Sequence, residues 1–351
     1  MKLKKSDTYL ILFMAFISFL FGIGILGRNI DTCVYGLFGT RFYNPKEFIG
    51  GYASTLTINN LYFGQLNVAI ILLTGLSVYF KKLYKSVLIN SKNLYINFLT
   101  AITVFTLSLT WPFYNYITNG FRQAVGLGFI ALFLSLQIKD VDYDKYKKNN
   151  LLKFLVFFFA AFSHSSSLYI LIIYIFSLII EKIITLFNVS SISKINIYSL
   201  LLSIPFSVGL TFASGIITKS AGDVIGYAIG IYLSFFSFLI LIFFNFIIKP
   251  RDLIFVPNNF ISLYQILSIT LILIPFNTQN VERMFTYYIL LIAPFSIKFI
   301  FSNIKQTYFF LGFLAIFIIG LTMVSTLYDQ SLSFNLNLYE FCQKWELPFL
   351  D

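Results

Sequence analysis

The sequence predicts an all-α protein that crosses a membrane many times. Of its 351 residues, 58% are hydrophobic and only 11% are charged, a balance that is unusual for a water-soluble domain. Several uncharged runs are each near or above the roughly 20 residues that a helix needs to cross a bilayer. Among these runs are residues 9–26, 224–248, 258–280 and 307–327. Only loops separate the runs, so we expect residues 1–351 to form a single transmembrane domain.

About eleven crossings are expected along the chain. They cover residues 7–26, 61–80, 94–113, 123–138, 151–163, 167–181, 195–214, 225–248, 259–276, 284–301 and 307–327. The first run follows three lysines, as in a signal peptide, but its length and the absence of a small-residue cleavage site indicate a retained anchor. The main segments outside the crossings are the 27–60 loop, the 139–150 loop and the 328–351 tail.

Residues 151–181 are expected to form a broken helical hairpin instead of one long span. Ser163, His164 and three further serines interrupt the centre of this run, and five polar residues at mid-bilayer depth would be costly. Two short helices would avoid that cost if the serine-histidine turn lay in a water-filled cavity. The alternative, one tilted span, would reverse the orientation of every later helix.

The distribution of basic residues favours the hairpin. With it, 18 of the 25 Lys and Arg residues lie on one side, which the positive-inside rule identifies as the cytoplasm. The N-terminus and the 139–150 loop are then cytoplasmic, whereas the 27–60 loop and the 328–351 tail are external. The inner residues are almost all lysines, but four of the five arginines lie outside. These four are Arg28, Arg41, Arg122 and Arg283. Because a guanidinium pairs with two phosphate oxygens at once, they suggest a phosphate-bearing ligand.

Other ligand classes find little support in the sequence. The net charge of +11 is scattered over short loops, so nucleic-acid binding is not expected. No glycine-rich phosphate loop or zinc motif occurs, and we predict no metal and no cofactor. Cys33 and Cys342 both fall on the expected outer side, where they either form a bridge or, as we expect, remain separate thiols.

Two polar clusters lie near the middle of the chain. At the expected outer start of the fourth span, Asn119, Arg122 and Gln123 surround a glycine that would permit an unusual backbone turn. The amides of a helix N-terminus attract anions there, although an interfacial arginine that reaches lipid headgroups would also explain Arg122. His164 is the only histidine. Histidine suits general-base catalysis near neutral pH, and it can equally donate a hydrogen bond to a phosphate or a sugar.

Two further clusters lie near the ends of the chain. At the expected outer start of the tenth span, Arg283 could bind phosphate while Glu282 acts as a base or binds sugar. The alternative is that the two charges only neutralise each other. Tyr287 follows them and could stack on a sugar, although an interfacial aromatic belt would explain it equally well. After the first span, a comparable group contains Arg28, Asp31 and Tyr35, for which self-paired loop charges are the alternative.

Together these segments resemble the polysaccharide polymerases of the EpsG/Wzy type, which extend O-antigen, capsule or exopolysaccharide chains. The resemblance covers about residues 21–300. It rests on N-G-x-R-Q-A at 119–124, an A-x-x-x-H-S-S-like segment at 160–166, R-x-x-D-T-x-x-Y at 28–35 and E-R-M-x-x-Y-Y at 282–288. The first two segments are the most specific. The third departs from the usual G-T-D-T, since Asn29 and Ile30 precede Asp31.

The resemblance implies a metal-independent glycosyltransferase of the GT-C-like type, with its active site at the periplasmic face of the bacterial inner membrane. Its substrates would be an undecaprenyl-diphosphate-linked oligosaccharide donor and a similar acceptor, and a chain-length regulator could be a partner protein. Arg122 and Arg283 would hold diphosphate with support from Arg28, and His164 or Glu282 would act as the base. Further substrate contacts would come from Asp31, Tyr35, Asn119, Gln123 and Tyr287.

Three other functions use similar features. An O-antigen ligase would take the same donor, but such ligases carry a large external loop late in the chain, where residues 277–283 form only a short one. A lipid-linked oligosaccharide flippase would also line a cavity with arginines, but the repeated halves typical of transporters are not found. A membrane acyltransferase would also use an intramembrane histidine, but no acidic residue stands beside His164 in the sequence.

Overall fold

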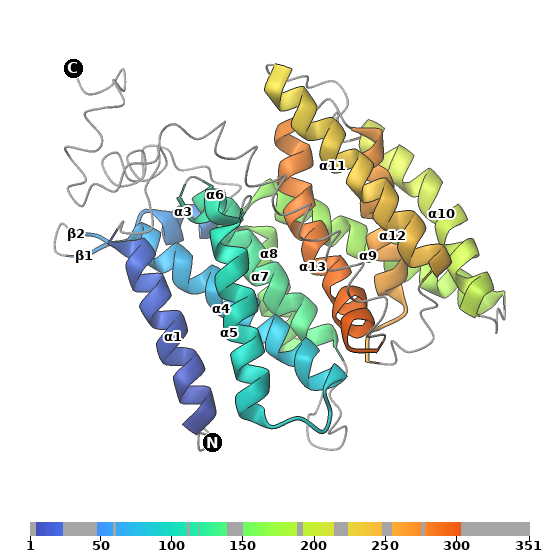
Figure 1. The fold of residues 1–351 in the computed structure, drawn as a ribbon. Coiled ribbons are helices and arrows are strands. Elements are labelled where there is room, and N and C mark those ends of the chain that lie inside the picture. Colours follow the sequence, from blue (N-terminus) through green and yellow to red (C-terminus); the bar gives the residue numbers. More distant parts are fainter. Residues whose placement is uncertain are drawn as a thin grey trace, which may run out of the picture. The chain divides into compact units, whose positions relative to one another are not determined.

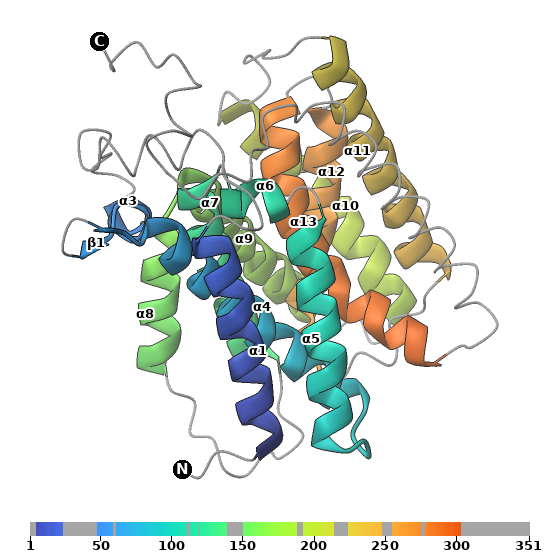
Figure 2. The ribbon, with the colours of Figure 1, turned by 60° about the vertical axis from the view of Figure 1, so that its left-hand side comes forward.

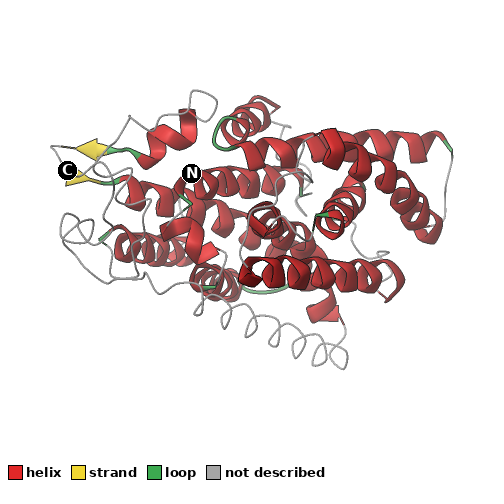
Figure 3. Cartoon of the chain, turned by 90° about the horizontal axis from the view of Figure 1, so that it is seen from above, coloured by secondary structure: helices red, strands yellow, loops and turns green. Residues whose placement is uncertain are grey.

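The computed structural model describes most of the first 302 residues, and these are nearly all helical (Figure 3). The described ranges are 5–23, 48–58, 61–110, 113–118, 120–138, 150–187, 192–213, 224–247, 255–274 and 278–302. The one pair of strands within them is antiparallel, with β1 at Thr57–Ile58 and β2 at Leu61–Tyr62. The chain divides into two compact units, each described by itself. The first holds the described residues up to 136 and from 150 to 168, and the second holds those from 169 onward with 137 and 138.

The first unit is built around three long helices that pack side by side. Its elements are α1 (Lys5–Gly22), α3 (Phe48–Ser54), α4 (Gly64–Val87), α5 (Asn93–Leu109), α6 (Phe113–Thr118), α7 (Phe121–Gln137), α8 (Asn150–Ala161) and the first turn of α9 (Ser165–Leu186). The helices α1, α4 and α5 contact one another and alternate in direction (Figures 1 and 2). The short helices α3 and α6 pack near the end where α1 finishes and α4 begins.

The two ends of this unit differ in chemistry. At one end, Asp7 of α1 accepts hydrogen bonds of 2.9 Å from Lys81 of α4 and from Asn97 of α5. At the other end, a Cβ atom on Gly22 would lie 2.6 Å from the Leu66 Cβ, so α1 and α4 approach closely there. Aromatic packing of Phe21 against Tyr114 of α6 also occurs at this second end, with ring centroids 6.2 Å apart.

The second unit contains the remainder of α9 and four further helical segments. These are α10 (Ile192–Ala213), α11 (Val224–Ile242) with its π-helical continuation η4 (Phe243–Ile247), α12 (Asn259–Leu273) and α13 (Thr278–Ser302). The helix α12 packs against α10, α11 and α13. Its interfaces include polar contacts: Ser207 donates to the Ile266 carbonyl at 3.1 Å, and Ser234 donates to the Leu271 carbonyl at 2.7 Å. Hydrogen bonds between small side chains and backbone thus join helices that otherwise consist mainly of apolar residues.

The structure confirms two predictions: the protein is helical, and several of its helices are apolar and long enough to cross a membrane. By length and composition, α1, α4, α9, most of α10 and most of α13 could each cross a membrane. Five shorter apolar helices, including α5, α7, α8 and α12, lie at other predicted crossings. Both the long and the shorter helices expose large apolar side chains, such as Phe16 of α1 and Phe98 of α5. The predicted total of eleven crossings remains a prediction, and the 307–327 crossing and the 328–351 tail lie outside the described residues.

The break in the 151–181 run is confirmed. The helix α8 ends at Ala161, residues 162 and 163 form a turn, and α9 begins at Ser165. The Ser163 hydroxyl donates a hydrogen bond to the Phe159 carbonyl at 2.5 Å, which satisfies a carbonyl near the end of α8. The polar residues therefore terminate one helix and begin the next, as their cost inside a continuous span predicts. Whether α8 and α9 form a transmembrane hairpin remains a prediction.

Candidate functional site

The start of α7 and the turn between α8 and α9 meet at Gly50 of α3, within the first unit. A Cβ atom on Gly50 would overlap the Ser163 carbonyl oxygen and would lie 3.0 Å from the Cβ of Arg122. The Ile49 amide also donates a hydrogen bond of 3.2 Å to the Phe162 carbonyl, which ties α3 to the turn. The absence of a side chain at Gly50 is therefore what allows the three segments to meet. We call this place the Gly50 junction.

His164 lies at the Gly50 junction, where it is the N-cap residue of α9. Its carbonyl accepts hydrogen bonds from the amides of Ser167 and Leu168, at 3.0 and 3.2 Å. Its ring nitrogen Nδ1 accepts the Ser166 amide hydrogen at 3.1 Å, and the Ser166 hydroxyl lies 2.7 Å from the same nitrogen. In a neutral imidazole with an accepting Nδ1, the hydrogen is on Nε2. The ring is thus arranged to donate from Nε2 and not to accept a proton there.

Arg122 is the second residue of α7 and its side chain is half-buried. Gly120 caps this helix, because its carbonyl accepts the Ala124 amide at 2.9 Å. The backbone angle φ of Gly120 lies outside the left-handed region, so the glycine is not needed there for its own backbone conformation. Space is tight instead: a Cβ atom there would lie 2.9 Å from Oε1 of Gln123 and 3.0 Å from the Tyr116 ring, so these side chains would have to shift to admit one. The Gln123 side chain is buried and turns back over the start of its own helix.

The electrostatic environment of the Gly50 junction favours an anion. The N-terminal ends of α7 and α9 both lie there, and the amides at a helix start carry partial positive charge. The Arg122 guanidinium adds a full positive charge. Among the described side chains of the first unit, Asp7 is the one carboxylate, and it lies at the opposite end with Lys81. A phosphate group at the junction would therefore meet positive charge.

The predicted residues of the tenth span lie in the second unit. The helix α13 begins at Thr278, so Glu282 and Arg283 lie in its second turn and not before the helix as the predicted boundary of 284 implied. The backbone of Glu282 is helical, and its side chain lies outside what the structure describes. The Arg283 side chain is half-buried. Tyr287 is 0% exposed, which leaves no ring face open for the predicted contact with a sugar.

The remaining predicted residues are not among those described. They are Arg28, Asp31, Tyr35 and Asn119, together with Arg41, Cys33 and Cys342. Arg122 and Arg283 belong to different units, so their predicted cooperation in holding one diphosphate remains a prediction. Of the predicted site, the structure brings together Arg122 and the segment that carries His164.

Two contributors to the junction were missed from the sequence. Gly50 lies in the segment Phe48–Ser54, whose paired glycines between aromatic residues indicate close packing only once a partner helix is known. Ser166 is the other, because it supplies both hydrogen-bonding groups that face Nδ1 of His164. Polar residues before an apolar helical run are a recognised N-cap signal, and they could have identified a helix start within residues 163–167.

Comparison of the chain with protein-family models, with curated proteins and with solved structures finds no match.

Proposed function

We propose that the chain is a membrane polysaccharide polymerase that joins undecaprenyl-diphosphate-linked oligosaccharides by glycosyl transfer. The observation that carries this proposal is the Gly50 junction. The segments around Arg122 and His164 lie about forty residues apart in the sequence, and they are the two that most specifically resemble the EpsG/Wzy type. Their meeting at Gly50, beside two helix starts, supports a shared role in binding an anion. The orientation of this site toward the periplasm is part of the proposal.

The proposed reaction uses the junction to hold the leaving group. The acceptor hydroxyl attacks the anomeric carbon of the donor sugar and forms the new glycosidic bond. The bond from that carbon to the diphosphate oxygen breaks, and its electron pair leaves with the lipid diphosphate. Arg122 and the Nε2–H of His164 donate hydrogen bonds to the diphosphate as its charge grows, the stage at which fixed donors lower a barrier most.

The acceptor proton requires a base other than His164 in this arrangement. The Nδ1 of His164 already accepts a hydrogen bond from the Ser166 amide, at 3.1 Å, and its Nε2 carries a hydrogen. A change of tautomer would remove the acceptor that caps α9. Glu282 is therefore the candidate base in the proposed mechanism, with Arg283 and Arg28 available to a second lipid diphosphate.

A deletion strain tests the proposed reaction directly. We expect its lipopolysaccharide, or the equivalent surface polysaccharide, to give a single-repeat band on a gel instead of a ladder of long chains. Loss of every O-chain would indicate a ligase or a flippase instead, because those activities are needed before even one unit is displayed. An unchanged ladder would refute a role in this pathway altogether.

Variants at Arg122 test the site within the same strain. Arg122→Gln removes the charge and the fork of donors, and we expect chain extension to slow about 100-fold or more, as for other lost transition-state donors. Arg122→Lys keeps the positive charge but loses the paired N–H donors that bind two phosphate oxygens at once, so we expect an intermediate loss of chain extension. Lys85→Gln, an exposed change at the opposite end of the first unit, is the control and should leave the ladder intact. A full ladder from Arg122→Gln would exclude Arg122 from the site.

A further inference from the structure

The helices α10 and α12 of the second unit contact each other along a stripe of small polar side chains. On α10 the stripe has a spacing of three or four residues, which places its members on one face of the helix. Ser199 of this face donates to Oε1 of Gln265 at 2.5 Å. Ser207, two turns later, donates to the Ile266 carbonyl at 3.1 Å, so the face is turned toward α12. We call the α10–α12 seam the following residues, each at most 4% exposed: Asn196, Ser199, Ser203, Ser207 and Thr211 of α10, and Ser262 and Gln265 of α12.

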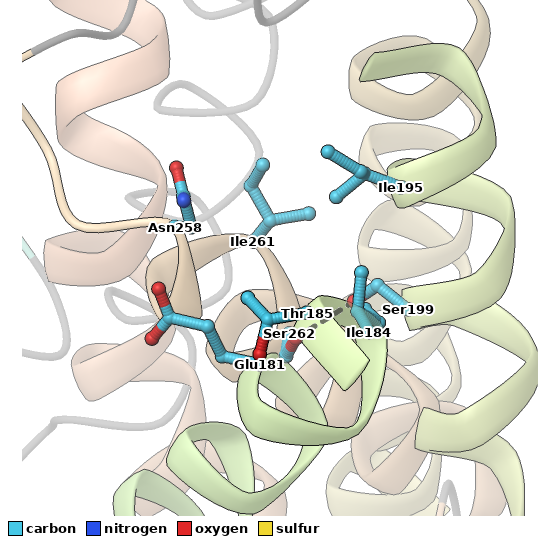
Figure 4. Close-up of a pocket in the computed structure, with 8 residues that line it drawn as sticks. All are labelled: Glu181, Ile184, Thr185, Ile195, Ser199, Asn258, Ile261 and Ser262. Atoms are coloured by element: carbon cyan, nitrogen blue, oxygen red, sulfur yellow. Dashed lines mark hydrogen bonds between the residues drawn. The ribbon is translucent and has the colours of Figure 1, made fainter. Parts of the chain in front are cut away.

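Direct hydrogen bonds hold the middle of the seam. Gln265 donates from Nε2 to the Asn196 carbonyl at 3.2 Å and to Oδ1 of Asn245 at 2.7 Å, so it joins α12 to α10 and to η4. The Ser199 and Ser262 hydroxyls lie 2.7 Å apart (Figure 4). Because the hydroxyl hydrogen of Ser199 is directed at Gln265, Ser262 is the donor in this pair. The two helices are thus kept at a fixed spacing around Ser199.

Two buried polar atoms of the seam have no hydrogen-bond partner among the described residues. One is Oδ1 of Asn196, a residue that is 4% exposed, and the other is the hydroxyl of Ser203, which is 0% exposed. Asn196 lies three residues before Ser199 and Ser203 lies four residues after it, on the same face of α10. Burying a polar atom without a partner is costly, and nearly all such atoms in proteins bond to protein or to water. The two atoms therefore point to a ligand within the seam.

The surroundings restrict this ligand to a small neutral molecule. None of the residues that define the seam is charged, so an ion would lose its hydration there without a counter-charge. Water fits the two atoms, because it can donate to Oδ1 of Asn196 and can donate to or accept from the Ser203 hydroxyl. A pocket lined by Ser199 and Ser262 borders the seam (Figure 4). Its volume of about 50 Å³ exceeds the roughly 10–15 Å³ that one water molecule needs.

We propose that the α10–α12 seam binds ordered water molecules, one at Oδ1 of Asn196 and another at the Ser203 hydroxyl. The two residues are about 10 Å apart along the helix at 1.5 Å per residue, so one molecule does not bridge both. The water exchanges with solvent through the pocket at Ser199 and Ser262. Bound water then joins α10 to α12 beside the direct hydrogen bonds, inside a unit whose helices are otherwise mainly apolar. This site does not depend on the proposed function.

Hydrogen–deuterium exchange of a buried thiol tests the proposal in the full-length protein. Cys33 and Cys342 are replaced by serine, so that Ser203→Cys carries the only thiol, and infrared spectra follow the conversion of its S–H band to S–D in D2O. The control is Ser237→Cys on α11, where the serine is also 0% exposed but its hydroxyl donates to the Leu233 carbonyl at 2.9 Å. We expect the thiol of Ser203→Cys to exchange about tenfold faster or more. Equal rates for the two thiols would overturn the proposal.

Thermal unfolding gives a second test that needs no thiol. Ser203→Ala and Ser237→Ala gain the same helix propensity, and under the proposal each also loses one satisfied hydroxyl, so we expect similar unfolding midpoints. A dry, unpaired hydroxyl at Ser203 would destabilise the unmodified protein, and Ser203→Ala would then unfold at a clearly higher midpoint than Ser237→Ala. That result would overturn the proposal. So would a midpoint of the unmodified protein that rises with sodium chloride but not with equal choline chloride, because it would indicate a bound cation instead of water.

Discussion

At the scale of single residues, His164 performs two tasks with two different nitrogens. Nδ1 caps α9 by accepting the Ser166 amide hydrogen, whereas Nε2 carries the hydrogen that the proposed mechanism uses. Asparagine is also a strong N-cap residue, because its side-chain oxygen can accept the same hydrogen, but it has no ring nitrogen at the position of Nε2. The two tasks can therefore be separated by substitution.

We expect His164→Asn to keep the cap and lose polymer extension. Its thermal unfolding should stay close to that of the unmodified protein, whereas His164→Ala should lose about 1 kcal/mol because the cap is gone. Both variants should give a single-repeat band on the polysaccharide gel. A normal ladder from His164→Asn would mean that the imidazole only caps the helix.

The close approach at Gly50 gives a second prediction. In Gly50→Ala the added methyl group would overlap the Ser163 carbonyl oxygen, so α3 must shift away from the turn. We expect a loss of about 1–3 kcal/mol in stability and shorter polysaccharide chains. Tyr52→Ala removes an exposed side chain from the same helix (65% exposed) and serves as the control. Equal behaviour of the two variants would show that the Gly50 junction is not needed.

Single residues of the site were predictable only where their chemistry is unusual for a membrane. Arg122 and His164 could be identified because a charge or an imidazole in an apolar chain needs a reason. Gly50 could not, since a glycine becomes informative only when the backbone that approaches it is known. The surroundings of Gly120 could not be predicted for the same reason: the side chains of Gln123 and Tyr116 crowd the position, and its own backbone angle does not call for glycine.

At the scale of helices, the crossing of α4 and α7 depends on two glycines. A Cβ atom on Gly128 would lie 2.8 Å from the Ile71 carbonyl oxygen, and one on Gly75 would overlap the backbone of Gly128. Small residues let helix backbones approach closely, which is the main source of attraction between helices in lipid. Because α7 carries Arg122 at its start, this crossing also fixes the position of the helix that bears Arg122.

A matched pair of alanine substitutions tests this crossing. Replacing glycine by alanine inside a helix ordinarily stabilises the helix by roughly 0.5–1 kcal/mol. A Cβ atom on Gly209 of α10 would meet nothing within 4 Å, so Gly209→Ala should keep that gain or be neutral. Gly128→Ala should instead lose about 1–3 kcal/mol through overpacking. Thermal unfolding of the two variants in the same detergent measures the difference, and equal midpoints would contradict a tight crossing.

The long helices were predictable from the sequence, but the short ones were not. Uncharged runs identified the positions of α1, α4 and α9, because a helix in lipid must satisfy all its backbone groups internally. The break at His164 followed from the cost of polar residues in such a run. In contrast, α3 and α6 have only seven and six residues, too short to be stable without the surfaces on which they pack.

At the scale of the whole chain, the first unit has two chemically distinct ends. The pair of Asp7 and Lys81 lies at one end, and Arg122 and His164 lie at the other. The 18 residues of α1 extend about 27 Å at 1.5 Å per residue, close to the ~30 Å thickness of the hydrocarbon layer. If α1 crosses the membrane, the two ends must therefore face opposite sides. The lysines then predict that the Gly50 junction faces outward.

Cysteine labelling of intact cells tests this orientation. Cys33 and Cys342 are first replaced by serine, so that only an introduced cysteine can react. Tyr52→Cys places a thiol on α3 at the Gly50 end, and Ile89→Cys places one in the turn after α4, at the opposite end; both positions are exposed, at 65% and 63%. We expect an impermeant maleimide to label Tyr52→Cys in intact cells and to reach Ile89→Cys only after the cells are opened. The reverse pattern would place Arg122 and His164 in the cytoplasm, where polymerisation at the outer face could not use them, and the proposed function would fail even if the fold were right.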